Sequence, residues 1–192
     1  MSKADKIVKP ILIVVLIVAI LGGYYALSNR DKSSSEEADA VSGPVEEVLM
    51  WDLVNHYPAT PKEVVKYYSE LTKVFYGEDY SDAQLEALAE VALSLYDVEL
   101  ANNKPKDVYL MDLKSEIAGM KSKDYVIYSY SPSASTDVVY FEKDGHECAS
   151  LYCTYTFRLG TTMSSTEEIY ILRKDFQGHW KILGWEAVDR DE

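Results

Sequence analysis

The sequence is poor in the residue types that most often carry chemistry. Its 192 residues include two cysteines and three histidines, and the histidines, at His56, His146 and His179, have no metal-ligand spacing. A glycine-rich phosphate loop, a Gly-x-Ser-x-Gly turn and a Cys-x-x-Cys pair are all missing. We therefore expect no metal site, no cofactor and no catalytic residue, and we do not expect an enzyme.

Basic residues are scarce relative to acidic ones. The chain has 19 lysines and arginines against 32 aspartates and glutamates, a formal net charge of −13. After Leu27 the imbalance is 16 basic to 31 acidic residues. Such an acidic domain repels phosphate backbones, so we do not expect nucleic acid as a partner. The acidity is expected to keep the domain soluble, and binding of a basic partner or of cations is the alternative.

The two cysteines do not predict a disulfide. Cys148 and Cys153 lie five positions apart in one alternating stretch, so they point to opposite faces of a strand. Their Cα atoms would be roughly 16 Å apart at about 3.3 Å per residue, whereas a disulfide needs about 4.4–6.8 Å. We therefore expect two free thiols, with Cys153 in the core and Cys148 more exposed.

That alternating stretch, residues 147–159, is the strongest structural signal that the sequence does contain. A period of two predicts a β-strand with one buried and one wetter face. Most strands have about 5–6 residues, so we expect this one to be central and curved. Its expected inner face consists of Ala149, Leu151, Cys153, Tyr155, Phe157 and Leu159.

Shorter β-type runs surround the long strand. Turn signals at Asp144-Gly145 and Gln177-Gly178 separate several of them. Strands that follow one another through turns predict an antiparallel meander. The expected strands besides the long one are residues 124–131, 137–143, 166–174 and 179–188.

Helical patterns come before the strands. Capping boxes start at Thr60 and Ser81, the first with proline at the first helical position. A short helical pattern covers residues 45–56, and a weaker one covers residues 106–120. Helices followed by strands predict an α+β fold, with N-terminal helices packed on one face of a curved antiparallel sheet that encloses a pocket. The candidate pocket-lining residues are Tyr152, Tyr155, Trp180 and Trp185.

The N-terminus carries the only long apolar run. Every residue in 11–21 is apolar, and the uncharged run continues to residue 27, close to the about 20 residues of a spanning helix. Three lysines precede it, so the N-terminus should be cytoplasmic. We expect a cytoplasmic segment at 1–10, a single-pass transmembrane anchor at 11–27, a disordered tether at 28–44 and an extracytoplasmic domain at 45–192. A cleaved signal peptide is the alternative.

The order of these elements resembles the nuclear transport factor 2-like superfold, which includes ketosteroid isomerase and SnoaL-like domains. The sequence GHWKI at residues 178–182 is similar to the glycine-any-tryptophan-lysine-isoleucine ending of many such domains. The run at residues 57–65 resembles uncharacterised, singly anchored bacterial proteins of Gram-positive anaerobes. The resemblance covers residues 57–188 and implies a cone-like α+β roll. Because this superfold hosts enzymes, binders and scaffolds, it does not indicate one function.

We expect a membrane-anchored, non-catalytic interaction or scaffold module of the cell envelope, with envelope proteins or further copies of the chain as partners. One alternative is binding of a small apolar or aromatic ligand in the sheet cavity. Another is an isomerase- or hydrolase-like enzyme, since isomerases of the superfold use a carboxylate beside a hydrogen-bonding tyrosine or aspartate. The long strand has no inward carboxylate, and Glu147 at its start is the nearest one.

Overall fold

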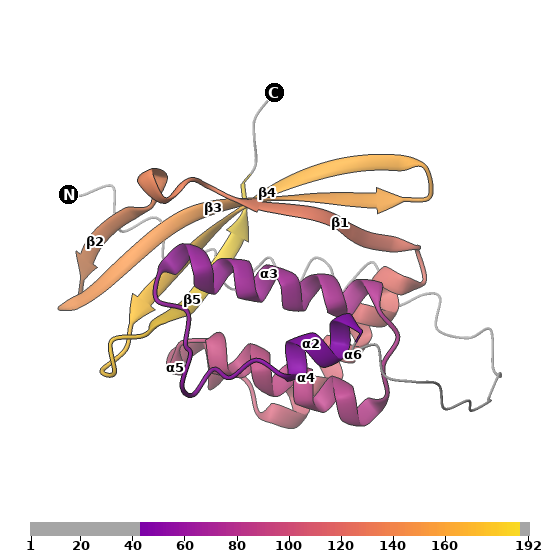
Figure 1. The fold of residues 1–192 in the computed structure, drawn as a ribbon, viewed down its shortest axis with the longest axis horizontal. Helices are drawn as coiled ribbons and strands as arrows, with labels where there is room; N and C mark the ends of the chain where they lie inside the picture. The colour runs from indigo at the N-terminus through magenta and orange to yellow at the C-terminus, as the bar shows by residue number, and fades with distance from the viewer. Residues whose placement is uncertain (1–42, 189–192) are drawn as a thin grey trace.

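The computed structural model describes residues 43–188 (Figure 1). The segments expected at 1–10, at 11–27 and, apart from its last two residues, at 28–44 lie outside the described residues. Within residues 43–188, no helix has both the length and the apolar character needed to cross a membrane. Pro44, which the sequence placed in the tether, is the first residue of a helix.

The described chain is an α+β fold with an open, antiparallel, five-stranded sheet. Figure 1 shows the helices on one side of the sheet, with α3 next to it. The helices are α2 (Pro44–Leu49), α3 (Pro61–Gly77), α4 (Asp82–Leu95), α5 (Val98–Ala101) and α6 (Lys106–Lys121), with a 3-10 turn η2 (Ser135–Asp137). The strands are β1 (Tyr125–Pro132), β2 (Val139–Lys143), β3 (His146–Leu159), β4 (Thr162–Lys174) and β5 (Trp180–Ala187).

Both predicted capping boxes are present and begin the two long helices α3 and α4. The Thr60 hydroxyl accepts a hydrogen bond from the Glu63 N–H at 3.2 Å, and the Glu63 carboxylate accepts one from the Thr60 N–H at 3.1 Å. Ser81 and Gln84 make the same reciprocal pair before α4. These bonds satisfy N–H groups that a helix start leaves without partners.

The helix expected over residues 45–56 is shorter than predicted, because α2 ends at Leu49. The next residues form a turn around Asp52, whose carboxylate accepts hydrogen bonds from the Asn55 backbone N–H at 3.0 Å and from the Asn55 side chain at 2.9 Å. Aspartate offers the backbone a local alternative to the helical hydrogen bonds, so this turn replaces the second half of the expected helix.

The strand β3 is central, as its alternation predicts. It pairs with β4 along one edge, and its other edge is shared by two strands. β1 pairs with residues 153–159 of β3 and β2 pairs with residues 146–150. The simple meander is therefore wrong in its first step, because the loop at 133–138 carries the chain along the edge of β3 before β2 begins. The N–H of Ser133 donates to the carbonyl of Tyr152 at 2.8 Å and fixes the start of that loop.

The inner face of the sheet packs on the helices and forms most of the core. Ala149, Leu151, Cys153 and Tyr155 are buried on this face. Both cysteines are free thiols, as expected. Cys148, expected to be more exposed than Cys153, is buried as well, since only 2% of its surface is accessible. It lies between its pairing partners Phe141 and Arg173, whose larger side chains shield it.

A β-bulge in β5 changes which residues of that strand face the helices. Leu172 pairs with Ile182 and Ile171 pairs with Gly184, so Leu183 is an extra residue. An extra residue shifts the alternation by one position. As a result Ile182 and Trp185, three positions apart, both lie on the inner face.

Candidate functional site

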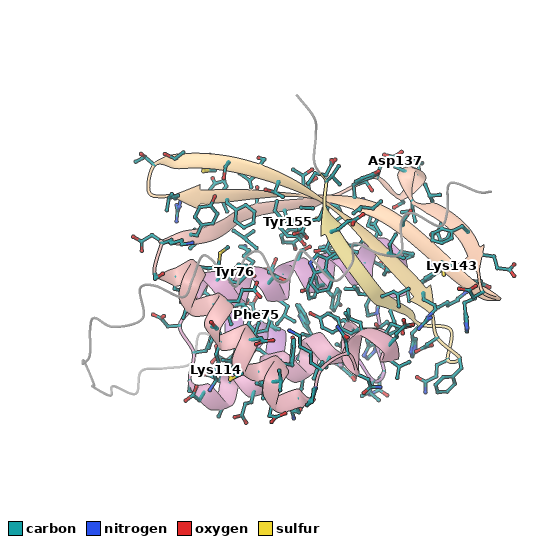
Figure 2. The ribbon with its side chains drawn as sticks, turned by 180° about the vertical axis from the view of Figure 1, so that it is seen from behind. Phe75, Tyr76, Lys114, Asp137, Lys143 and Tyr155 are labelled. Atoms are coloured by element: carbon teal, nitrogen blue, oxygen red, sulfur yellow. The ribbon has the colours of Figure 1, made fainter. Side chains whose placement is uncertain are left out.

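A chain of polar side chains crosses the core between α3, β3 and β4. The hydroxyl of Tyr155 lies 2.7 Å from the Ser69 hydroxyl and 2.7 Å from the Tyr170 hydroxyl, and Tyr170 donates to the Glu168 carboxylate at 2.8 Å. At its other end, Ser69 donates to the carbonyl of Val65 at 2.8 Å. Figure 2 shows Tyr155 on the side of the sheet that faces the helices.

Counting protons shows how the hydrogen bonds of this chain depend on the protonation of Glu168. When the carboxyl is protonated, it can donate to Tyr170, which then donates to Tyr155, which donates to Ser69, which keeps its bond to the Val65 carbonyl. Every contact then holds one proton. When the carboxylate is ionised, Tyr170 donates to it and Tyr155 donates to Tyr170, so Ser69 has one proton for two acceptors, the Val65 carbonyl and the Tyr155 hydroxyl. Desolvation raises the pKa of Glu168, the hydrogen bond from Tyr170 acts in the opposite direction, and the nearby charge of Glu116 adds to the rise.

The second carboxyl comes from α6. Tyr76 of α3 donates a hydrogen bond to Glu116. Desolvation raises the pKa of Glu116, and the neighbouring charge of Asp112 raises it further, while the Tyr76 bond and Lys104 act in the opposite direction. Glu116 itself is exposed to solvent. Two carboxyls with raised pKa values, one on α6 and one on β4, thus lie close enough for the charge of Glu116 to act on Glu168.

Aromatic rings pack together between the helices and the sheet. The Trp185 ring centroid lies 5.2 Å from that of Tyr68, 5.8 Å from that of Tyr96 and 6.0 Å from that of Tyr170. The hydroxyl of Tyr96 donates to that of Tyr68 at 3.1 Å. These spacings are those of packed aromatic pairs, so this cluster belongs to the core.

The pH dependence of stability should reveal the state of Glu168. Because its folded pKa is raised, the folded chain binds a proton more tightly than the unfolded chain, so stability falls as pH rises through the folded pKa. Glu168→Gln stays neutral and removes this loss. We expect the variant to gain stability relative to the natural chain as the pH increases from about 4.5, the ordinary pKa of glutamate. Denaturant unfolding at several pH values checks this, and parallel stability curves would contradict it.

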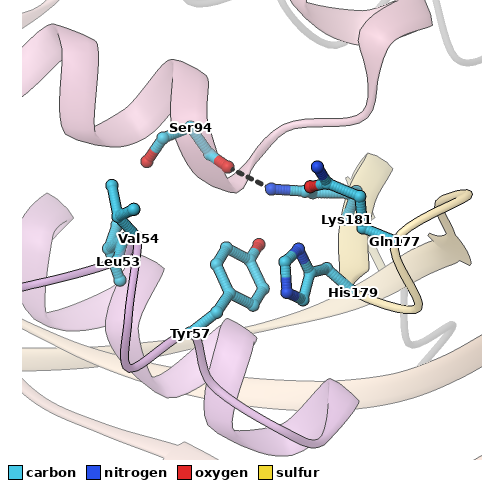
Figure 3. Close-up of a pocket in the computed structure, with 7 residues that line it drawn as sticks. All are labelled: Leu53, Val54, Tyr57, Ser94, Gln177, His179 and Lys181. Atoms are coloured by element: carbon cyan, nitrogen blue, oxygen red, sulfur yellow. Dashed lines mark hydrogen bonds between the residues drawn. The ribbon is translucent and has the colours of Figure 1, made fainter.

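An open pocket lies at another place, where three segments meet at one end of the domain (Figure 3). The segments are the link between α2 and α3, the end of α4, and the turn and start of β5. The pocket has a volume of about 430 Å³. Its lining residues are Leu53, Val54, Tyr57, Ser94, Gln177, His179 and Lys181.

The Tyr57 ring organises one wall of this pocket. It stacks on the His179 ring with centroids 4.4 Å apart, and its hydroxyl donates to the carbonyl of Trp180 at 3.0 Å. The Lys181 ammonium lies 4.1 Å from the centroid of the same ring and donates to the carbonyl of Ser94 at 2.7 Å. Desolvation lowers the pKa of Lys181, opposed by the charges of Asp175 and Asp97.

The opposite wall is apolar and open. Leu53 is partly buried, and Val54 is 89% exposed. Phe176, next to the lining residue Gln177 in the chain, is 96% exposed. Exposed large apolar side chains beside a concave surface are typical of binding sites. The pocket can therefore hold an apolar group on one wall and a hydrogen-bond acceptor near His179 and Lys181 on the other.

The family model described as "Domain of unknown function (DUF6715)" matches residues 1–185 of the chain. The chain belongs to this family. The match extends across nearly all of the described elements and also across the N-terminal residues that the structure does not describe. Among curated proteins no match was found.

In this DUF6715 chain the four candidate pocket residues do not line one cavity. Tyr155 and Trp185 both contact Tyr170, but as part of the packed core. Trp180 lies farther along the inner face, where its ring is 5.7 Å from that of Tyr140. Tyr152 is on the opposite face of β3 and is 42% exposed, because it alternates with Leu151 and Cys153.

Two features of the DUF6715 chain escaped the sequence analysis. Glu168 lies two residues before Tyr170 on β4, so the alternation that places Tyr170 inward also places Glu168 inward, and this signal was available. The open pocket carried no such signal, because it joins residues 53–57, Ser94 and residues 177–181.

Proposed function

We propose that this DUF6715 protein is a membrane-anchored, non-catalytic interaction module of the cell envelope, and that the pocket beside Tyr57 is where it meets its partner. The observation that carries this is the pocket itself, which combines a solvent-open apolar wall with the donors of His179 and Lys181. The partner segment would present an apolar side chain next to a carboxylate or carbonyl acceptor.

The arrangement in the cell follows from the sequence. The apolar run at 11–27 would cross the membrane once, with residues 1–10 in the cytoplasm. A tether at 28–43 would span roughly 20–25 Å as a flexible coil, and the folded domain would lie outside. Helices that precede an open antiparallel sheet and pack on one face of it support a nuclear transport factor 2-like, cone-like roll for this domain.

The space under the sheet is a weaker site for a ligand or for acid–base chemistry. Glu168 has the raised pKa that such chemistry would use, but Tyr170 already bonds its carboxyl and aromatic rings pack around that tyrosine. The pocket beside Tyr57, by contrast, is open to solvent.

Photo-crosslinking in the native cells tests the proposal. A photoreactive phenylalanine at Val54 of the full chain should give a discrete adduct with an envelope protein, and the adduct should stay with the membranes after an alkaline wash. The same probe at Lys123, in the exposed turn after α6, is the matched control and should give none. Lys181→Glu should reduce the Val54 adduct, since it replaces the donor. Equal adducts from both positions, or none from Val54, would refute the proposal.

A further inference from the structure

The strand β2 has an edge without a partner in the described part of the chain. It pairs with β3 on one side, and residues 43–188 contain no strand on the other. All five of its residues are exposed, among them Val139 at 59%, Tyr140 at 59% and Phe141 at 37%. Exposed edge strands with apolar side chains are templates for pairing with another chain.

The turn after β2 shows which backbone groups are free at this edge. Asp144 and Gly145 have φ angles of 53° and 77°, which is the signature of a two-residue type I′ hairpin turn. The flanking pair, Lys143 with His146, is therefore hydrogen-bonded. Bonding alternates along the strand, so the N–H and C=O groups of Tyr140 and Glu142 point away from β3.

We infer that β2 pairs with β2 of a second copy of the chain, antiparallel and with a two-fold axis at Tyr140. In this register Tyr140 lies opposite the partner's Tyr140, and Glu142 lies opposite the partner's Val138. Tyr140 and Glu142 carry the free backbone groups, and Val138, which is extended and directly precedes β2, continues the alternation. The pairing then forms about six hydrogen bonds between the copies. The two sheets join into one continuous sheet.

Side chains favour this register over its neighbours. On the outer face Val139 meets the partner's Phe141, a branched–aromatic pair that strands favour, and the symmetry repeats it. Asp137, the last residue of η2 and two residues before β2, comes next to the partner's Lys143, again twice. A register centred on Phe141 would form about four backbone bonds and leave Asp137 without Lys143. A register centred on Glu142 would place two carboxylates opposite each other.

The charges at the two ends of the edge make the surface self-complementary. Asp137 and Lys143 are exposed and form no ion pair within residues 43–188, and Figure 2 labels them at opposite ends of this edge. The net charge of −13 opposes association of two chains. Salt screens that repulsion beyond about 8 Å at physiological ionic strength, so the direct contacts decide the outcome. This surface is separate from the pocket beside Tyr57 and does not depend on the function proposed for it.

A cysteine placed on the two-fold axis tests the register. In the full chain in membranes, Tyr140→Cys should form an intermolecular disulfide under mild oxidation, because opposed strand residues lie within the range of disulfides. Glu142→Cys, on the same strand and face, is the matched control. In the proposed register, residue 142 of one chain lies four positions along the strand from residue 142 of the other chain. Cysteines at this position should therefore not cross-link. The natural chain, with both cysteines buried, should also stay uncross-linked.

A charge swap provides the second readout. In the Tyr140→Cys background, Lys143→Asp should lower the cross-linked fraction several-fold, because it places two acids opposite each other. Adding Asp137→Lys should restore it. If Tyr140→Cys and Glu142→Cys cross-link equally, if neither does, or if the double swap stays as low as Lys143→Asp, the inferred pairing is wrong.

Discussion

Replacing Asp97 with alanine is expected to lower the free energy of unfolding by about 2–4 kcal/mol, from the loss of charge-assisted hydrogen bonds to a largely buried guanidinium and of a helix cap. Asp97 is 3% exposed. Its carboxylate accepts hydrogen bonds from the Arg173 Nε at 2.9 Å and from the Arg173 Nη2, and it caps α5 by accepting from the Glu99 N–H at 2.9 Å. The substitution leaves the Arg173 guanidinium without its main partner and the start of α5 without its cap.

Denaturant unfolding followed by tryptophan fluorescence measures this effect in the full chain. The matched control is Asp79→Ala, which removes a fully exposed partner of Lys121 at 3.4 Å. Exposed pairs contribute little, so this control should change stability by no more than about 0.5 kcal/mol. Equal losses in the two variants would contradict the assigned role of Asp97.

Tyr170→Ala should destabilise the fold to a similar extent, by about 3–5 kcal/mol, because it leaves a cavity among packed rings. Tyr170 is 1% exposed and contacts Tyr68 and Trp185. Tyr170→Phe keeps the ring but leaves Tyr155 and Glu168 without their shared partner, which should cost about 1–3 kcal/mol. The difference between the two variants separates packing from hydrogen bonding.

The control for this pair is Tyr152→Ala on the outer face of β3. The two tyrosines belong to neighbouring strands but lie on opposite faces of the sheet, so the same truncation at Tyr152 should cost less than about 1 kcal/mol. Unfolding of all three variants under one set of conditions makes the comparison. A Tyr152→Ala loss as large as that of Tyr170→Ala would show that the outer face is covered.

Sequence patterns predicted those parts of the fold that depend on interactions between residues close together in the chain. The alternation at 147–159 and the capping boxes at Thr60 and Ser81 each involve groups within a few residues, and the structure confirms them. The alternation of β4 also indicates that Glu168, two residues before Tyr170, points inward. This inward carboxylate lies outside the long strand.

Features that depend on distant segments were not predictable in this way. Trp180 and Trp185 are five positions apart, and an unbroken alternation would place them on opposite faces. The extra residue Leu183 places both of them inward, and only the pairing with β4 reveals that bulge. Likewise, Cys148 is buried by its neighbours Phe141 and Arg173 from other strands. The pocket beside Tyr57 needs three segments that meet only in the folded domain.

β1 and β2 pair with the same edge of β3, and this arrangement affects the order in which the strands fold. β2, β3, β4 and β5 are joined by short turns, so their pairing involves low sequence separation and can form early. The pairing of Tyr125 with Leu159 closes a much larger loop, and such closure slows folding rather than weakening the folded state. The docking of β1, together with the α3 helix that packs against it, is therefore the step that should limit the folding rate.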